Sequence, residues 1–257
     1  MATIKVLVLR TAGINCDQET AHAFNIAGAT SETHHVNELI KNPSLLNEFQ
    51  ILALPGGFSY GDDIASGRIL ANQILHHFYD AIMQFVSAGK LVIGICNGFQ
   101  VLVKTGLLPG CDVAGDKRTQ ATVTHNDSGK FEDRWVYLKP ATDKCVFITP
   151  EQQLYLPVAH GEGKVYLHDG IAKSVNENQI AFRYVDSNGH FGDYPINPNG
   201  APDHIAGLCD TTGQIFGLMP HPERHIHKTH HPRWTRNEGN ETPDGLTIFR
   251  NAVNYFA

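Results

Sequence analysis

The stretch LVIGICNGFQVLVKTG, residues 91–106, decides the fold of this chain. Its first five residues are apolar or glycine and predict a buried strand over residues 91–95. Residues 99–105 predict a helix that ends at Gly106, because glycine is a favoured C-terminal cap. Gly94 and Gly98 bracket Cys96 between the two, and strand, sharp turn and helix in that order are typical of a nucleophile elbow.

Cys96 has two interpretations in this context. In an elbow, the sulfur stands clear of the sheet beside a helix N-terminus, where free N–H groups and the helix dipole favour the reactive thiolate. The plainer alternative is a buried structural cysteine at the end of a core strand. The motif alone does not separate the two, so the rest of the chain must supply a base and oxyanion donors if Cys96 is a nucleophile.

Predicted strands and helices alternate through the first 106 residues. Strands are predicted over residues 4–9, 31–36, 50–54 and 91–95, and helices over residues 16–27, 43–48, 67–88 and 99–105. Such an alternation implies βαβ units, and therefore a mainly parallel sheet with helices on both faces.

The second half of the chain contains shorter strand-like runs. They cover residues 119–124, 135–139, 154–158, 164–168 and 179–185, before a hairpin of 205–209 with 215–219 and a final helix over 244–255. We expect these runs to add antiparallel strands to the sheet. The predicted fold is therefore α/β, with a mainly parallel central sheet flanked by helices, in a single domain over residues 1–257.

The composition excludes several classes of function. The hydrophobic fraction of 42% and the charged fraction of 18% are ordinary for a globular protein, and a net charge of −6 gives no sign of a nucleic-acid or anionic membrane partner. The apolar run at residues 4–9 is too short for a signal sequence or a membrane span. The cysteines have no CxxC spacing, which argues against a disulfide framework or a zinc site and fits the reducing cytoplasm. They are Cys16, Cys96, Cys111, Cys145 and Cys209.

A candidate base follows the last predicted strand, in the sequence MPHPE of residues 219–223. Residues before proline are pushed into an extended conformation, and residues two apart in an extended segment project to the same side. The imidazole of His221 and the carboxylate of Glu223 should therefore lie together, so that the carboxylate fixes the histidine tautomer. The plainer alternative is a solvated histidine in a proline-rich loop.

Candidate oxyanion donors follow the predicted strand 50–54. Gly56 and Gly57 present backbone N–H groups without side-chain obstruction, and their loop leaves the same end of a parallel sheet as the Cys96 turn. Taken alone, Gly-Gly after a strand indicates only a tight turn.

These segments together resemble the class I (triad) glutamine amidotransferases. The resemblance rests on GICNGFQ at 94–100, PGGFSYGD at 55–62 and PHPER at 220–224. AHGEG at 159–163 and NPNG at 197–200 are similar to the family of glutaminase subunits of phosphoribosylformylglycinamidine synthase, an enzyme of purine biosynthesis. The chain departs from this pattern at Ala201, where serine is expected, and in a longer segment at 224–240.

The resemblance implies a flavodoxin-like fold and a Cys-His-Glu triad. The Cys96 thiolate would attack the side-chain amide of L-glutamine, with His221 as base and acid and Glu223 as its support. The N–H groups of Gly57 and Asn97 would hold the oxyanion, so Asn97→Ala should keep substantial activity. For Gln100, the alternative to a substrate contact is an ordinary position on the helix surface. The residues implied to contact the substrate are Gly56, Gln100, His160 and Glu162.

The resemblance also implies partners. The chain has no P-loop and no evident ATP or magnesium site, so no cofactor is expected in it. ATP and magnesium are expected on a separate, larger synthetase subunit, which would use the ammonia to convert formylglycinamide ribonucleotide to its amidine. A small third subunit would bridge the two, and glutaminase activity should rise on assembly.

Two other interpretations of the whole chain remain open, and the histidine-rich run raises a local question of metal binding. A cysteine α/β-hydrolase shares the elbow, but it takes its acid from a loop before the histidine rather than two residues after it. A non-enzymatic redox or stress protein on a related fold would use Cys96 as a sensor. The histidine-rich run at 225–231 fits no common zinc spacing, so a metal is not expected there and a partner interface is favoured.

Overall fold

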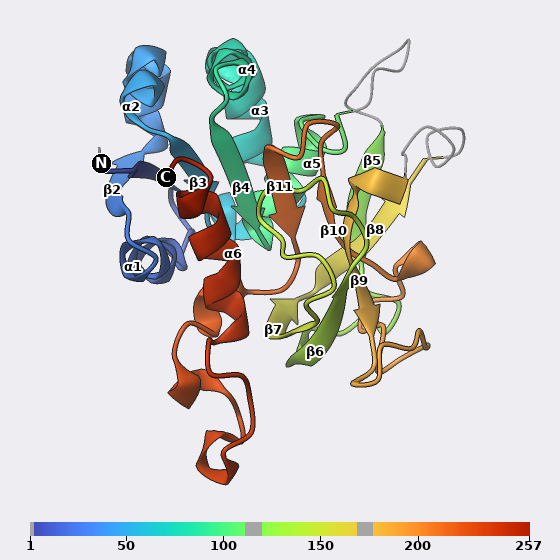
Figure 1. The fold of residues 1–257 in the computed structure, drawn as a ribbon. Helices are drawn as coiled ribbons and strands as arrows, with labels where there is room; N and C mark the ends of the chain where they lie inside the picture. The colour runs from blue at the N-terminus through green and yellow to red at the C-terminus, as the bar shows by residue number, and fades with distance from the viewer. Residues whose placement is uncertain (1–2, 111–119, 169–176) are drawn as a thin grey trace.

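Strand β4 (Leu91–Ile95) lies inside a nine-stranded sheet with the order β2-β1-β3-β4-β11-β10-β9-β6-β7 (Figure 1). This computed structural model describes residues 3–110, 120–168 and 177–257. The first five strands in this order run parallel: β2 (Thr30–His35), β1 (Lys5–Arg10), β3 (Ile51–Leu54), β4 and β11 (Ile215–Leu218). Their order is that of flavodoxin-like folds.

The remaining strands of the large sheet pair antiparallel with their neighbours. They are β10 (Ile205–Cys209), β9 (Ile180–Val185), β6 (Glu132–Pro140) and β7 (Leu154–His160). A separate two-stranded antiparallel sheet joins β5 (Ala121–His125) to β8 (Glu162–Leu167). The predicted parallel sheet with antiparallel additions is confirmed. Cys111 and residue 119, where a strand is predicted to begin, lie outside the described residues.

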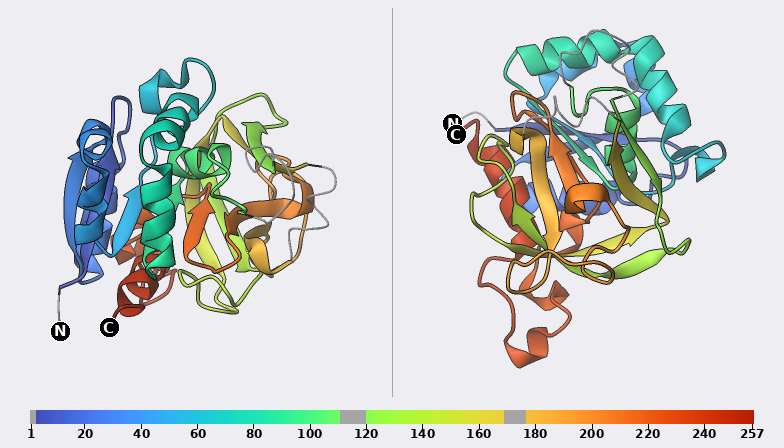
Figure 2. Two further views of the ribbon diagram at one scale, coloured as in Figure 1. Left: turned by 90° about the horizontal axis from the view of Figure 1, so that it is seen from above. Right: turned by 90° about the vertical axis from the view of Figure 1, so that its right-hand side faces the viewer.

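Helices cover both faces of the parallel part of the sheet (Figures 1 and 2). Helices α1 (Asp17–Ile26) and α6 (Asp244–Asn254) pack on one face, where the rings of Phe24 and Phe249 meet edge to face at 4.9 Å. The other face carries α2 (Val36–Lys41), α3 (Arg68–His77), α4 (Tyr79–Ser87) and α5 (Asn97–Lys104). Within the described residues, no helix is both long enough and apolar enough to cross a membrane.

One helix prediction was wrong in detail, and one helix was not predicted. The single helix expected over 67–88 breaks at Phe78 (φ −147°, ψ 21°) into α3 and α4, and Ile74, Phe78 and Ile82 are all buried. Residues 36–41 form the unpredicted helix α2, which begins with a capping box between His35 and Glu38. Residues 43–48 form a 3-10 helix.

Close packing of α5 on the central strands explains the two glycines of the elbow. A Cβ on Gly98 would lie 1.9 Å from the Leu54 carbonyl oxygen of β3. A Cβ on Gly94 would lie 2.7 Å from the Gly98 carbonyl oxygen. Only glycine lets the helix approach the sheet this closely, and this approach sets the position of Cys96.

Candidate active site

Cys96 lies in the turn between β4 and α5. Its backbone has φ 49° and ψ −104°, a conformation that costs a non-glycine residue about 1–3 kcal/mol. Its N–H donates to the Leu218 carbonyl at 2.8 Å, and its carbonyl accepts the Gln100 N–H at 3.1 Å. The strained residue thus ends the strand and begins the helix in one step, and places the sulfur beside the free N–H groups of the first helical turn.

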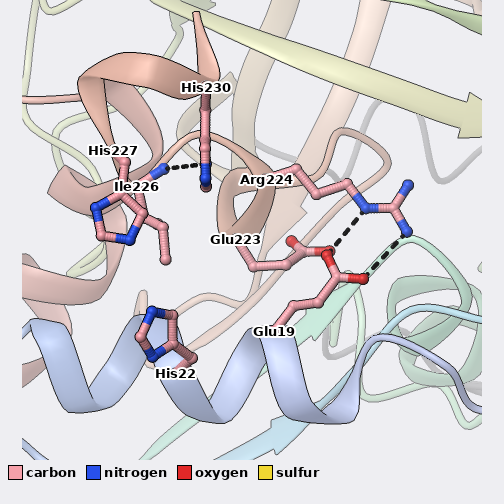
Figure 3. Close-up of a pocket in the computed structure, with 7 residues that line it drawn as sticks. All are labelled: Glu19, His22, Glu223, Arg224, Ile226, His227 and His230. Atoms are coloured by element: carbon pink, nitrogen blue, oxygen red, sulfur yellow. Dashed lines mark hydrogen bonds and ion pairs between the residues drawn. The ribbon is translucent and has the colours of Figure 1, made fainter.

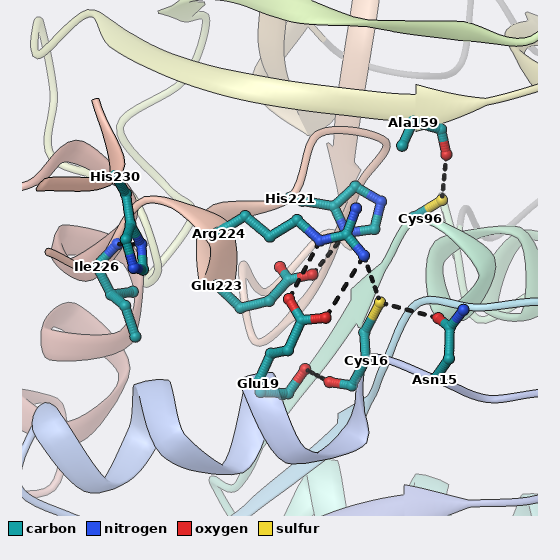
Figure 4. Close-up of polar contacts among 11 residues, drawn as sticks. Asn15, Cys16, Glu19, Cys96, Ala159, His221, Glu223, Arg224, Ile226 and His230 are labelled. Atoms are coloured by element: carbon teal, nitrogen blue, oxygen red, sulfur yellow. Dashed lines mark hydrogen bonds and ion pairs between the residues drawn. The ribbon is translucent and has the colours of Figure 1, made fainter. Parts of the chain in front are cut away.

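His221 and Glu223 form a buried pair next to Cys96 (Figure 4). The His221 N–H donates to the Pro157 carbonyl at 2.8 Å, which ties the segment after β11 to β7. Nδ1 of His221 lies 2.5 Å from Oε1 of Glu223. Burial lowers the pKa of His221, but the charges of Glu223 and Cys96 outweigh it and raise that pKa well above its usual value. The surroundings of His221 therefore favour its imidazolium form.

Gly56 lies where the triad leaves no room for a side chain. A Cβ on Gly56 would come within 2.9 Å of Cε1 of His221 and 3.5 Å of Cβ of Cys96. Gly57 follows with φ 138° and pairs with Ile14 in an isolated bridge. No acceptor in the described part of the chain takes the Gly57 N–H. The structure thus brings the Gly-Gly turn to Cys96, with one backbone donor unused.

The side chain of Asn97 holds the loop that follows this turn. Its Oδ1 accepts the Ser59 N–H at 3.1 Å, and its Nδ2 donates to Oδ1 of Asp62 at 3.2 Å. The loop needs such support because Tyr60, Gly61 and Asp62 all have positive φ. The sequence predicts a role for the Asn97 backbone only, and the structure adds a positioning role for its side-chain amide.

Gln100 is hydrogen-bonded to Glu162 and to Asn97. The Gln100 amide donates to the Glu162 carbonyl at 2.6 Å and accepts from Asn97 Nδ2 at 2.9 Å. Burial, and less strongly the nearby Glu162 charge, raises the pKa of Asp62. The Gln100 amide is therefore held by Asn97 and by the Glu162 backbone, and the predicted substrate contacts of Gln100 and Glu162 stay predictions.

His160 lies on β7 beside the triad. Its Nδ1 bonds to Oδ1 of Asn126 at 3.1 Å, while its Nε2 is buried with no hydrogen-bond partner in the described chain. Burial, followed by the charge of His221, lowers the pKa of His160 to about 4. The ring is therefore neutral near pH 7. The neighbouring Ala159 carbonyl accepts from the Cys96 thiol at 3.7 Å.

Cys16 is a neighbour of the triad that the sequence analysis missed. It lies buried at the start of α1, where its Sγ accepts from Nη2 of Arg224 at 3.2 Å (Figure 4). Arg224 also pairs with Glu19 at 3.1 Å. Burial raises the pKa of the Cys16 thiol, against the opposing effects of His221 and Arg224. The sequence near Cys16 does not predict this contact, because Cys16 and Arg224 are 208 residues apart.

A cavity of about 560 Å³ borders Glu223 of the triad (Figure 3). Its lining residues are Glu19, His22, Glu223, Arg224, Ile226, His227 and His230. The histidine-rich run is therefore divided. His225 and His231 are buried and pack against the Trp135 ring, with centroids 5.2 and 6.1 Å away, whereas His227 and His230 face the cavity.

Comparisons with known proteins point in the same direction as the site. Residues 3–256 match the sequence model of the CobB/CobQ-like glutamine amidotransferase domain. The chain is 49% identical to phosphoribosylformylglycinamidine synthase subunit PurQ of Dehalococcoides mccartyi, over 99% of this chain and 98% of the relative. It is 44% identical to the same subunit of Methanococcus maripaludis, over 98% and 97% of the two chains. The structure of PurLQS from Thermotoga maritima matches with a TM-score of 0.76 and 30% identity, over 100% of both chains.

Proposed function

The chain belongs to the family of CobB/CobQ-like glutamine amidotransferases, and we propose that it is the glutaminase subunit of phosphoribosylformylglycinamidine synthase. It hydrolyses L-glutamine to glutamate and supplies ammonia for the conversion of formylglycinamide ribonucleotide to formylglycinamidine ribonucleotide. The observation that carries this proposal is the strained Cys96 at a helix N-terminus beside the buried His221–Glu223 pair. The 49% identity to a PurQ subunit supports the choice of acceptor.

Nε2 of His221 takes the proton of the Cys96 thiol, and the raised pKa of His221 favours the imidazolium that this transfer forms. The thiolate attacks the amide carbon of glutamine, and the N–H groups of Gly57 and Asn97 hold the oxyanion. His221 then returns its proton to the departing ammonia, and water hydrolyses the glutamyl thioester. Loss of one oxyanion donor costs about 10²–10³-fold in rate.

Glu223 and His160 set the charge around His221. Glu223 holds Nδ1 of His221 protonated, so that Nε2 is the basic nitrogen. His160 stays neutral and adds no competing positive charge. Gly56 and His160 are the expected substrate contacts that lie at the triad, and they line the place where the amide would bind.

We place the remaining chemistry on partner subunits. A larger synthetase subunit holds ATP and magnesium, and a small third subunit bridges it to this chain. The similarity to a structure of PurLQS supports this assembly. The chain acts as one domain in the cytoplasm, which is supported by the family match over residues 3–256 and by the four cysteines of the described residues, all of which are unpaired.

Labelling with a glutamine-analogue diazoketone tests this function. We expect covalent attachment at Cys96 that glutamine blocks, and no attachment in Cys96→Ala. Cys145→Ala removes a buried thiol elsewhere and should label like the unmodified chain. Absence of labelling with retained esterase activity would favour a cysteine hydrolase, and absence of both would favour a redox or stress protein.

Reconstitution tests the partners. Glutamate release should rise when the synthetase and the bridging subunit are added with ATP and magnesium. Equal rates with and without them would contradict the coupling of the glutaminase to a synthetase.

A further inference from the structure

Three buried donor atoms of different chemistry meet on the side of His221 that faces α1. Sγ of Cys16, a ring nitrogen of His221 and a carboxylate oxygen of Glu223 all lie within 4.8 Å of one another. A thiolate, an imidazole and a carboxylate are the ligand types that Zn²⁺ takes in proteins. Zinc–ligand distances of about 2.0–2.3 Å place donor atoms about 3–4 Å apart, so small side-chain rotations close this triangle.

Glu223 carries a buried carboxylate oxygen without a partner. Its Oε2 makes no hydrogen bond within the described residues. A buried lone pair without a donor is costly, and a bound cation removes that cost for a carboxylate. This observation is independent of the spacing of the donors, and it points to a positively charged ligand.

The cavity that borders Glu223 gives such a cation a way in. Glu223 and Arg224 both line it, so the buried carboxylate borders a space of about 560 Å³ (Figure 3). Arg224 now lies 3.2 Å from the Cys16 sulfur, and its charge must leave when a cation arrives. Its Nε already pairs with Glu19 at 3.1 Å, so Arg224 keeps an anionic partner after it releases the thiol.

We propose that Cys16, His221 and Glu223 form a binding site for Zn²⁺, and that zinc bound there reversibly inhibits the glutaminase. The three side chains supply three ligands and leave a fourth position to water, a common arrangement for zinc. A ring nitrogen of His221 that binds zinc fixes the ring, and Glu223 no longer holds Nδ1. His221 then cannot take the Cys96 proton. The inhibition rests on the proposed function, whereas the binding does not.

A binding experiment on the full-length chain tests the site without any activity. Zn²⁺ is titrated in competition with a chromophoric chelator, using the unmodified chain, Cys96→Ala, Cys16→Ala and Cys209→Ala as a control for a buried thiol elsewhere. We expect Cys96→Ala and Cys209→Ala to bind one zinc as tightly as the unmodified chain. Cys16→Ala should bind at least about tenfold more weakly, because it loses a direct ligand.

The nature of the ligand is tested by cobalt. Co²⁺ bound by a thiolate gives a charge-transfer absorption, which we expect in Cys96→Ala and not in the Cys16→Ala/Cys96→Ala double variant. Cys16→Ser keeps the size of the side chain and should also lose this absorption, which separates loss of the ligand from loss of the fold.

Inhibition is measured on the complex with its partner subunits, each variant against its own rate without metal. Cys16→Ala should need at least about tenfold more Zn²⁺ for half inhibition. Tight binding that survives in Cys16→Ala and disappears in Cys96→Ala would overturn the proposal by placing zinc on Cys96 and His221. Binding lost only in His227→Ala would overturn it by placing zinc on the exposed histidines. A complex without glutaminase activity, with zinc binding still dependent on Cys16, would contradict the proposed function alone.

Discussion

Cys16 and Cys96 occupy equivalent places in the fold. Each follows a parallel strand, β1 or β4, and immediately precedes the next helix, α1 or α5. Both are buried, and both lie close to the position that a Cβ on Gly56 would take, with Cys16 Sγ at 3.3 Å and Cys96 Cβ at 3.5 Å. Position at the carboxyl edge of the sheet therefore does not by itself make a thiol a nucleophile.

Backbone conformation and local charge separate the two thiols. Cys96 has a positive φ of 49°, which turns its sulfur out of the strand in one residue, whereas Cys16 has φ −104° and ψ 13°. Cys16 accepts from Arg224, so its side of His221 carries a cation. The Cys96 side carries a neutral His160 and the Ala159 carbonyl. His221 therefore supplies a positive charge to Cys96 when it is protonated, whereas Cys16 has a fixed positive charge in Arg224.

The largest expected effect on kcat comes from replacing Cys96, the thiol that we propose as the nucleophile. Cys96→Ala should lower glutaminase kcat in the reconstituted complex by at least about 10³-fold, because no other group can form the thioester. Cys16→Ala removes a thiol from the same neighbourhood and should lower kcat by less than about tenfold. A comparable loss in the two variants, measured as glutamate release, would show that the elbow conformation does not select the nucleophile.

The sequence could predict the features that depend on nearby residues. The elbow follows from two glycines and a cysteine, and the His221–Glu223 pair follows from two prolines that hold the segment extended. Cys16 could not be placed, because its contact with Arg224 depends on how α1 packs against the segment after β11. The break at Phe78 and the Asn97 amide contacts likewise depend on tertiary packing that no local pattern encodes.

Gly56→Ala should have the next largest effect, because Gly56 separates the two thiols. The added Cβ would lie 2.9 Å from the His221 ring, which must move away from Cys96 or displace the loop. We expect kcat to fall by roughly 10²-fold, the usual consequence of an ångström-scale misplacement. Gly161→Ala is the matched control, since its Cβ would meet only a Phe131 carbon at 3.9 Å. Similar kcat values for the two variants would rule out a steric role for Gly56.

Asn97→Ala should have a smaller effect on kcat, because it changes only contacts near Cys96. The variant keeps the backbone N–H proposed for the oxyanion but loses the bonds to Ser59 and Asp62. We expect kcat to fall by roughly tenfold as the Gly57 loop loosens. Thr105→Ala removes a buried hydrogen bond at the other end of α5 and should leave kcat near its original value. A loss of 10³-fold in Asn97→Ala would instead assign the amide a direct contact with the oxyanion.

The last prediction concerns folding stability rather than kcat, and it tests the charge difference between the two sides of His221. Because the pKa of His160 is lowered to about 4 in the fold, against about 6.5 in the unfolded chain, the unfolded state binds more protons between these values. Folding stability from this group is complete above about pH 6.5 and is lost as the pH falls, by about 3 kcal/mol at pH 4. Denaturant unfolding at pH 7 and pH 4 should therefore show a loss smaller by about 3 kcal/mol in His160→Gln than in the unmodified chain. Equal losses would mean that His160 is charged in the fold, and the Cys96 side of His221 would then carry a cation as the Cys16 side does.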